Sequence, residues 1–166
     1  ISQRDLPSKE GSNERSGNRT PMQWTPGPTA GFSTCRPEQL YFPVATDGGR
    51  ITVSEEEKDR HSMLNFVRSL VALRQSSAAL GNTGDWRLLS DVDKPYPLVY
   101  QRSAGDETYI IAVNPSSASV RVNLPAISFC KGSTVSLVGK ASCKPEKGSL
   151  DIRMGGVSAA VFKLRD

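Results

Sequence analysis

The sequence predicts a mainly β protein, in which an antiparallel β-sandwich is preceded by a long loop and one helix. Three observations lead to this fold class. Residues 1–54 are rich in Gly, Pro, Ser, Asn and Arg and follow neither a strand period nor a helix period, which is typical of a loop. One segment of helical periodicity comes next, and beyond Gly84 the apolar residues recur with a period of two. Short segments of that kind, separated by turn residues, are typical of antiparallel sandwiches.

A helix is predicted to begin near Ser54. Residues 54–57 read Ser-Glu-Glu-Glu and match a capping box, in which the serine bonds the amide three residues on and the glutamate bonds back. Further along, apolar residues recur at steps of three and four, which predicts an amphipathic helix with one buried stripe. The stripe consists of Met63, Val67, Leu70 and Val71.

The segments with a period of two predict a series of strands. Between two of them, residues 104–107 read Ala-Gly-Asp-Glu, a short hairpin connection. The change of period places a domain boundary near residues 80 and 81. We expect strands at residues 86–89, 98–102, 108–113, 120–124, 134–138 and 159–164, with a weaker one at 150–153.

The composition argues against several classes of protein. Lys and Arg number 21 and are spread among 17 Asp and Glu, without the basic run or the basic and aromatic pattern of a nucleic-acid-binding protein. No stretch approaches the roughly 18 apolar residues of a membrane span. The N-terminal residues lack the charged-then-apolar order of a signal peptide. The sequence also lacks an initiating methionine, which we expect for an excised or processed piece of a longer protein. The compartment, cytoplasmic or periplasmic, stays open.

The cysteines do not suggest a metal site. Cys35, Cys130 and Cys143 show no Cys-x-x-Cys spacing, and His61 is the only histidine. We therefore expect neither a metal nor a cofactor. Cys130 and Cys143 could form a disulfide in an exported protein, whereas buried reduced thiols explain an odd count equally well.

The most specific motif is at residues 19–24, which read Arg-Thr-Pro-Met-Gln-Trp, with Ala-Gly-Phe at 30–32. Downstream, residues 59–64 read Asp-Arg-His-Ser-Met-Leu and residues 70–74 read Leu-Val-Ala-Leu-Arg. This order resembles the C-terminal part of the α-glucosidase branch of the α-amylase family, which includes oligosaccharide α-1,6-glucosidases and sucrose isomerases. In that branch a loop of the sugar pocket precedes the last helix of the barrel and a small all-β domain.

The resemblance implies a domain organisation and a parent activity. Residues 1–80 would be the C-terminal remnant of a (β/α)8 catalytic barrel, with its last helix, and residues 81–166 the all-β C-terminal domain. The implied parent is a retaining α-glucosidase with paired carboxylates roughly 5 Å apart. Those carboxylates would lie upstream of Ile1, because a complete barrel needs roughly 200 residues or more. The chain itself is expected to be inactive and to contain no catalytic residue.

The resemblance also implies three substrate-binding residues, Arg19, Gln23 and Trp24. Arg19 would pair with an aspartate of an early barrel loop and contact hydroxyls of the terminal glucose, and a guanidinium fork suits both tasks. Gln23 would hold the loop or contact substrate. Trp24 would stack on a sugar ring or, as we favour, anchor the loop by burying its indole. Thr25 stands where many relatives carry an acidic residue.

Two expectations concern partners. The oligosaccharide would be contacted only through the parent enzyme, and the helix stripe would pack on the missing barrel. Without the barrel, the stripe would pack on the β domain or on another copy of the chain. Linkage, and hydrolysis as against isomerisation or transglycosylation, are left open.

A hypothesis of a different class is a self-standing carbohydrate-binding or structural sandwich without catalysis. A binding module would need a row of exposed aromatic side chains on one sheet face. The aromatic residues available after Gly84 are Trp86, Tyr96, Tyr100, Tyr109, Phe129 and Phe162.

Overall fold

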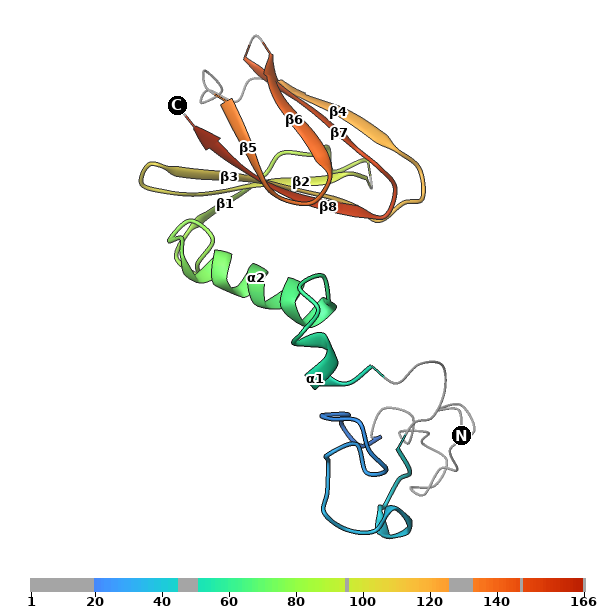
Figure 1. Cartoon of the computed structure of the whole chain (residues 1–166). Helices are drawn as coiled ribbons and strands as arrows, with labels where there is room; N and C mark the ends of the chain where they lie inside the picture. Colours follow the sequence, from blue (N-terminus) through green and yellow to red (C-terminus); the bar gives the residue numbers. More distant parts are fainter. Residues whose placement is uncertain (1–19, 45–50, 95, 126–132, 147, 166) are drawn as a thin grey trace. The chain divides into compact units, whose positions relative to one another are not determined.

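The computed structural model describes residues 20–44, 51–94, 96–125, 133–146 and 148–165. The chain divides into two compact units, Ile1–Val71 and Ala72–Asp166. This division falls within a helix, and the predicted boundary between residues 80 and 81 stays a prediction. Figure 1 shows the order of the elements along the chain.

In the described residues of the C-terminal unit there are eight strands in two sheets, and the strand pairings among them are antiparallel. The five-stranded sheet has the order β1-β2-β3-β8-β5, and the three-stranded sheet has the order β4-β7-β6 (Figure 1). The predicted antiparallel sandwich is therefore confirmed. The strands are β1 (Asp85–Leu88), β2 (Leu98–Ala104), β3 (Glu107–Asn114), β4 (Val120–Pro125), β5 (Ser133–Val138), β6 (Ala141–Glu146), β7 (Ser149–Met154) and β8 (Ser158–Arg165).

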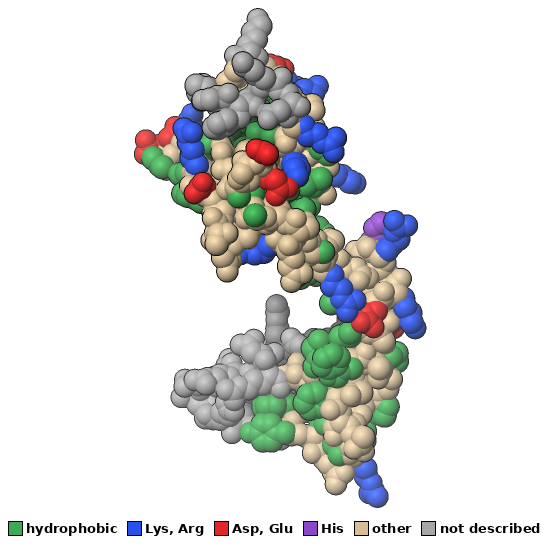
Figure 2. All heavy atoms as spheres, turned by 90° about the vertical axis from the view of Figure 1, so that its left-hand side faces the viewer, with side chains coloured by type: hydrophobic (Ala, Val, Ile, Leu, Met, Phe, Trp, Pro, Cys, Tyr) green, Lys and Arg blue, Asp and Glu red, His purple; other side chains and the backbone are tan. Residues whose placement is uncertain are grey.

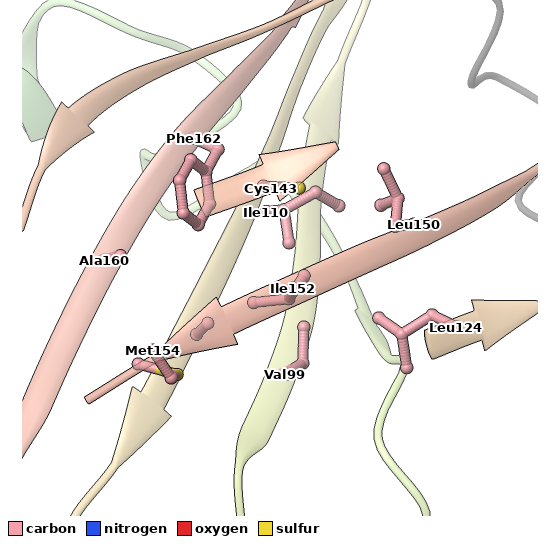
Figure 3. Close-up of a cluster of buried hydrophobic side chains, with 10 residues drawn as sticks. Val99, Ile110, Leu124, Cys143, Leu150, Ile152, Met154, Ala160 and Phe162 are labelled. Atoms are coloured by element: carbon pink, nitrogen blue, oxygen red, sulfur yellow. The ribbon is translucent and has the colours of Figure 1, made fainter. Parts of the chain in front are cut away.

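The core of this unit lies between the two sheets. Because side chains alternate across a strand, each strand sends every second residue into this layer. Phe162 of β8 lies opposite Ile110 of β3, and both are essentially fully buried. Ile152 of β7 faces them from the other sheet (Figure 3). The buried residues of this core are Val99, Ile110, Ala112, Leu124, Cys143, Leu150, Ile152, Met154, Ala160 and Phe162.

The strand predictions are confirmed apart from one omission. The hairpin between β2 and β3 has the predicted two-residue connection, because Ala104 pairs with Glu107. The strand that sequence reasoning missed is β6, which has no run of large apolar residues and contains Pro145. A proline removes a strand N–H and is tolerated at a sheet edge. Since β6 is an edge strand of its sheet, the proline fits there.

The predicted helix is in fact two helices, α1 (Val53–Glu56) and α2 (Met63–Gln75). The capping box also lies two residues before the predicted one. Thr52, which is buried, accepts a hydrogen bond at Oγ1 from the Glu55 amide (3.4 Å), and Oε2 of Glu55 accepts one from the Thr52 amide (3.1 Å). Both Thr52 and Ser54 can cap a helix, and burial of Thr52 decides between them.

Two polar side chains explain why the helix is interrupted. Asn65 Nδ2 donates to the carbonyl oxygens of Glu56 and Asp59, each at 2.9 Å. Ser62 Oγ donates to the Glu56 carbonyl (2.7 Å) and accepts from the Asn65 amide (3.2 Å), so that it caps α2. These side chains satisfy the carbonyls at the end of α1 that a continuous helix would bond to its own amides. The motif Asp-x-x-Ser-x-Leu is therefore a helix junction.

The apolar stripe of α2 has the predicted spacing, but three of its four side chains are exposed and Leu70 is half-buried. Met63 is 67 % exposed, and Val67 and Val71 are each 47 % exposed. Phe66, which the prediction did not include, is 45 % exposed. No residue of α2 is buried. The expected packing of this stripe against another surface stays a prediction.

Candidate functional site

The predicted substrate-binding residues lie in the loop that precedes α1. Arg19 is outside the described residues, as are Cys130 and Phe129. Gln23 and Trp24 are within the described part of the loop, residues 20–44, which also contains a short 3₁₀ helix, η3 (Pro37–Gln39). The site is therefore built here from Gln23, Trp24 and the groups that hold them.

A tight turn fixes the chain directly after Trp24. The carbonyl oxygen of Ala30 accepts hydrogen bonds from the amides of Trp24 (2.8 Å) and Thr25 (3.1 Å). Ala30 is fully buried and has a φ of 53°, and Gly31 has a φ of 67°. A Cβ at Gly31 would lie 2.5 Å from Thr25 Oγ1. The Ala-Gly-Phe motif thus has a backbone reason, because two successive left-handed residues close this turn and glycine adopts that conformation readily.

A second set of main-chain bonds ties the loop to the start of α1. The carbonyl oxygens of Gln23 and Trp24 accept from the amides of Val53 and Ser54, each at 3.0 Å. Those amides belong to the first turn of α1, where N–H groups have no partner within the helix. Residues about thirty positions apart in the sequence are in this way held side by side.

Within the described residues, the side chains of Gln23 and Trp24 make no hydrogen bond that would hold the loop. Oε1 of Gln23 is buried and has no hydrogen-bond partner among these residues. The Trp24 indole is 48 % exposed, so the expected anchoring by burial of the indole is not what the structure shows. Main-chain hydrogen bonds hold the loop in its place.

Other apolar side chains of the same loop are also exposed. Met22, Phe32 and Tyr41 are each half exposed or more. Figure 2 shows hydrophobic side chains, in green, gathered on the surface of the N-terminal unit. Contiguous exposed apolar surface of this kind usually marks a site of contact with another molecule or domain.

Three of the described carboxylates have a pKa below the ordinary value. The hydroxyl and amide of Thr52 bond Glu55 and lower the pKa of its carboxyl. Lys163 and then Ser77 lower the pKa of Glu107, and Arg121 and then Arg153 lower the pKa of Asp151. A glycosidase general acid needs the opposite, a raised pKa. None of these three carboxylates suits that role.

Two further searches of the described residues gave negative results. No group of three or more His, Cys, Asp or Glu side chains is placed to hold a metal ion within the described part of the chain. Among the helices that the structure describes, none is long and apolar enough to cross a membrane.

Two sequence profiles match adjacent parts of the chain. The family described as alpha amylase, catalytic domain, matches residues 2–83, which include the loop and both helices. The family described as maltogenic amylase, C-terminal domain, matches residues 87–161, which include most of the sandwich. The chain belongs to the α-amylase family. The resemblance of its motifs to this family is confirmed.

The relatives are longer proteins of the same family. The chain is 28 % identical over 156 residues to trehalose synthase from Thermus thermophilus, which covers 92 % of this chain and 16 % of that protein. It is 28 % identical over 151 residues to oligo-1,6-glucosidase from Parageobacillus thermoglucosidasius, covering 91 % of this chain and 26 % of that protein. The solved structure of trehalulose synthase MutB from Pseudomonas mesoacidophila matches with a TM-score of 0.68 at 27 % identity, over 91 % of this chain and 26 % of MutB. The chain spans about a quarter of these relatives or less.

Sequence reasoning missed the residues that position the site. Thr52, which caps α1, was not singled out, and Ala30 was quoted only as part of the Ala-Gly-Phe motif, without its role in closing the turn. Threonine followed three residues later by Glu55 is itself a capping signal, which the neighbouring run of glutamates obscured. No local signal predicts that Val53 and Ser54 bond the loop, because that contact joins distant parts of the sequence.

Proposed function

We propose that this chain supplies one wall of the sugar pocket in a glycosidase that acts on α-glucosidic bonds of oligosaccharides. The wall is the loop that contains Arg19, Gln23 and Trp24. The carboxylate nucleophile and the acid of a retaining mechanism come from the catalytic barrel, of which this chain contributes only the end. Residues 81–166 form the accessory β domain, and the chain alone does not catalyse the reaction.

The proposal depends on one observation: the main chain at Gln23 and Trp24 is held by hydrogen bonds, whereas their side chains have no hydrogen-bond partner among the described residues. The main-chain carbonyl oxygens of Gln23 and Trp24 each accept a hydrogen bond from an amide of α1. The Trp24 amide donates a hydrogen bond to the Ala30 carbonyl oxygen. Their side chains make no comparable bonds within the loop. Substrate positioning requires a rigid main chain whose side chains remain available to contact the ligand.

Gln23 has an acceptor that another molecule or domain can satisfy. A buried, unpartnered amide oxygen costs free energy, and such atoms are uncommon in folded proteins. A sugar hydroxyl or an N–H of the barrel would supply the missing donor to Oε1 of Gln23. The half-exposed face of Trp24 offers area for a pyranose ring. A mutant of MutB has been solved in complex with the substrate sucrose, and we propose α-linked glucosides as the ligand class.

The exposed stripe of α2 completes the proposal, because it needs a partner. Leaving a large apolar side chain in water rather than burying it costs about 1.5–3 kcal/mol. Met63, Val67 and Val71 are all exposed. We propose that the barrel covers them in the whole enzyme and that residues 1–80 act as its closing part.

The test uses the chain expressed together with the coding region upstream of Ile1. We expect turnover of a chromogenic α-glucoside by this longer protein and none above background by the 166 residues alone. Arg19→Ala is expected to lower kcat/KM by at least about tenfold, the loss of one charge-assisted contact. Trp24→Ala should lower it less.

Arg36→Ala is the matched control, because Arg36 is an exposed arginine of the same loop, and we expect it to leave kcat/KM unchanged. Turnover by the 166-residue chain alone would contradict the placement of the reactive carboxylates. Equal activity of the wild type and Arg19→Ala would contradict the role of the loop.

A second candidate function is a carbohydrate-binding accessory module. The observation in its favour is an aromatic pair on β1 and β2, in which Trp86 and Tyr100 have ring centroids 6.1 Å apart and Trp86 is 58 % exposed. Against it, Tyr109 and Phe162 are buried and cannot form a binding platform. Calorimetry of the chain with maltooligosaccharides decides: binding that Trp86→Ala abolishes would support the module, and no binding would exclude it.

A further inference from the structure

One end of the three-stranded sheet carries a concavity that has no part in the sugar-pocket loop. It has a volume of about 660 Å³ and lies where β4 begins, β7 ends and the turn between β5 and β6 returns. Arg121, Arg153 and Lys140 line it, and no Asp or Glu is among the described residues of its lining. Sites for small molecules have volumes of roughly 300–1,000 Å³.

A buried carboxylate orients two of the three cations. Arg121 and Arg153 lie directly opposite each other on β4 and β7. Nε of Arg121 donates to Oδ1 of Asp151 at 2.6 Å, and Nε of Arg153 donates to Oδ2 at 2.9 Å. Asp151 is 1 % exposed, so its position is fixed by packing. Because only Nε of each guanidinium is bonded, the terminal Nη groups are free to bind an acceptor.

The charges at this place do not cancel. Two like charges opposite each other on neighbouring strands repel unless something compensates them. Asp151 offsets one of the charges of Arg121 and Arg153, Glu146 of β6 also acts on Arg121, and Lys140 on the facing turn adds a further positive charge. Three cations against two carboxylates leave an excess of positive charge at the concavity.

The rim of the concavity is held rigid by a side chain that is fully buried. Nδ2 of Asn114 donates to the carbonyl oxygens of Ala118 and Gly155, each at 2.8 Å. Oδ1 of Asn114 accepts from the Ser116 amide (3.2 Å). On the opposite side Gly139 packs so closely that a Cβ would lie 1.9 Å from the Ala159 carbonyl oxygen. A rim that is ordered in advance reduces the entropy that a ligand must overcome on binding.

The lining decides between a neutral sugar and an anion. Stacking on a pyranose needs an aromatic face, and none of the described residues that line the concavity is aromatic. Guanidinium forks instead match the oxygens of a phosphate, to which they bond in pairs. The cationic side chains of Arg121, Arg153 and Lys140 line the same concavity and suit the three terminal oxygens of a phosphate monoester. The hydroxyls of Ser119 and Ser142 are available for the group that the phosphate carries.

We propose that this concavity binds the phosphoryl group of a small phosphate ester, with the ester's hydroxylated remainder on the serine side. The site is separate from the sugar-pocket loop and does not depend on the function proposed for that loop. Inorganic phosphate shares the recognised chemistry, and the experiment below separates the two ligands.

The test is calorimetric titration of the full 166-residue chain with glucose 6-phosphate, inorganic phosphate and glucose. We expect glucose 6-phosphate to bind, inorganic phosphate to bind more weakly and glucose not to bind. Lys140→Gln should weaken binding of glucose 6-phosphate about tenfold, as should Arg153→Gln, because each removes a charge-assisted contact. Added sodium chloride should weaken binding further.

Lys94→Gln is the matched control. Lys94 is an exposed lysine between β1 and β2 that does not line the concavity, and its variant should bind as the wild type does. Arg153→Gln leaves Asp151 with one hydrogen-bond partner and can lower the stability of the fold. Lys140 lies on an exposed turn, so we expect Lys140→Gln to change binding without changing stability. Undiminished binding by a folded Lys140→Gln protein would overturn the proposal. So would binding of glucose, or binding of inorganic phosphate as tight as that of the ester.

Discussion

The two units of this chain are stabilised in different ways. The sandwich encloses a core of its own, with Phe162, Ile110 and Ile152 at its centre. In the described part of the N-terminal unit the buried apolar residues are Pro21, Ala30, Phe42 and Val44. Hydrogen bonds hold that unit together, while most of its large apolar side chains are exposed. The difference teaches that the sandwich sequence specifies a self-contained fold, whereas the loop and helices are shaped to meet another surface.

The largest expected effect comes from removing one phenylalanine in each unit. Phe162→Ala should lower the free energy of unfolding by about 3–5 kcal/mol, because it leaves a cavity in the core. Phe66→Ala, at a side chain that is 45 % exposed, should lower it by less than about 1 kcal/mol. Urea unfolding of the full chain measures both. Similar losses for the two variants would show that α2 is packed as tightly as the sandwich core.

A pair of glycines gives the next effect. Gly139→Ala would combine a φ of 80° with a Cβ 1.9 Å from a backbone oxygen, and we expect a loss of more than about 2 kcal/mol, or roughly 8–16 °C in the Tm of the sandwich. Gly31→Ala is also strained, at a φ of 67° with a Cβ 2.5 Å from Thr25 Oγ1, but it lies in the N-terminal unit, so the sandwich Tm should be unchanged. Differential scanning calorimetry makes the measurement. A fall in that Tm with Gly31→Ala would mean that the units unfold together.

Acid should weaken the sandwich through Asp151 and Glu107. Both carboxyls have a pKa lowered below the ordinary values of 3.8 and 4.5, so they stabilise the folded state fully above those values. That contribution is lost as the pH falls through the lowered pKa of the folded state. Asp151→Asn should therefore be less stable than the wild type at neutral pH, and the difference should shrink as the pH falls below 3.8. Urea unfolding at each pH makes the measurement, with Asp106→Asn, in an exposed turn, as the control. If the unfolding free energies of Asp151→Asn and wild type differ by the same amount at every pH, the prediction is contradicted.

The smallest effect on stability is expected at the apolar stripe of α2. Substitutions there are tested by their effect on self-association of the chain. Without the barrel, the exposed side chains of α2 should promote self-association of the chain. Val67→Gln should reduce association in sedimentation velocity, with a change in unfolding free energy within about 0.5 kcal/mol. Val92→Gln, at a residue 82 % exposed in the C-terminal unit, is the control. A wild-type chain that sediments as a monomer at all concentrations would rule the idea out.

Local sequence patterns predicted most of the elements and the family, but they failed where distant residues compete. The strands of β2, β3, β4, β5, β7 and β8 followed from their alternation, since a period of two reports which face is buried. For β6 the pattern failed, because the residues facing the core are small apart from Pro145 and the strand is completed by its neighbours. The helix was predicted as one piece because nothing local shows that Asn65 bonds the Glu56 and Asp59 carbonyls. At the candidate site, Gln23 and Trp24 were predicted by resemblance, while their support by Val53 and Ser54 was not.

The amino-acid sequence by itself determined the class of each segment, the motif at residues 19–24 and the family, because propensity, turn residues and periodicity are local properties. Only the tertiary structure decided that β8 lies between β3 and β5, that Thr52 rather than Ser54 caps α1, and that Arg121, Arg153 and Lys140 line one concavity. These outcomes depend on which distant groups become buried together. The free energy of burial and hydrogen bonding between such groups is set by the folded arrangement and cannot be read from neighbouring residues alone.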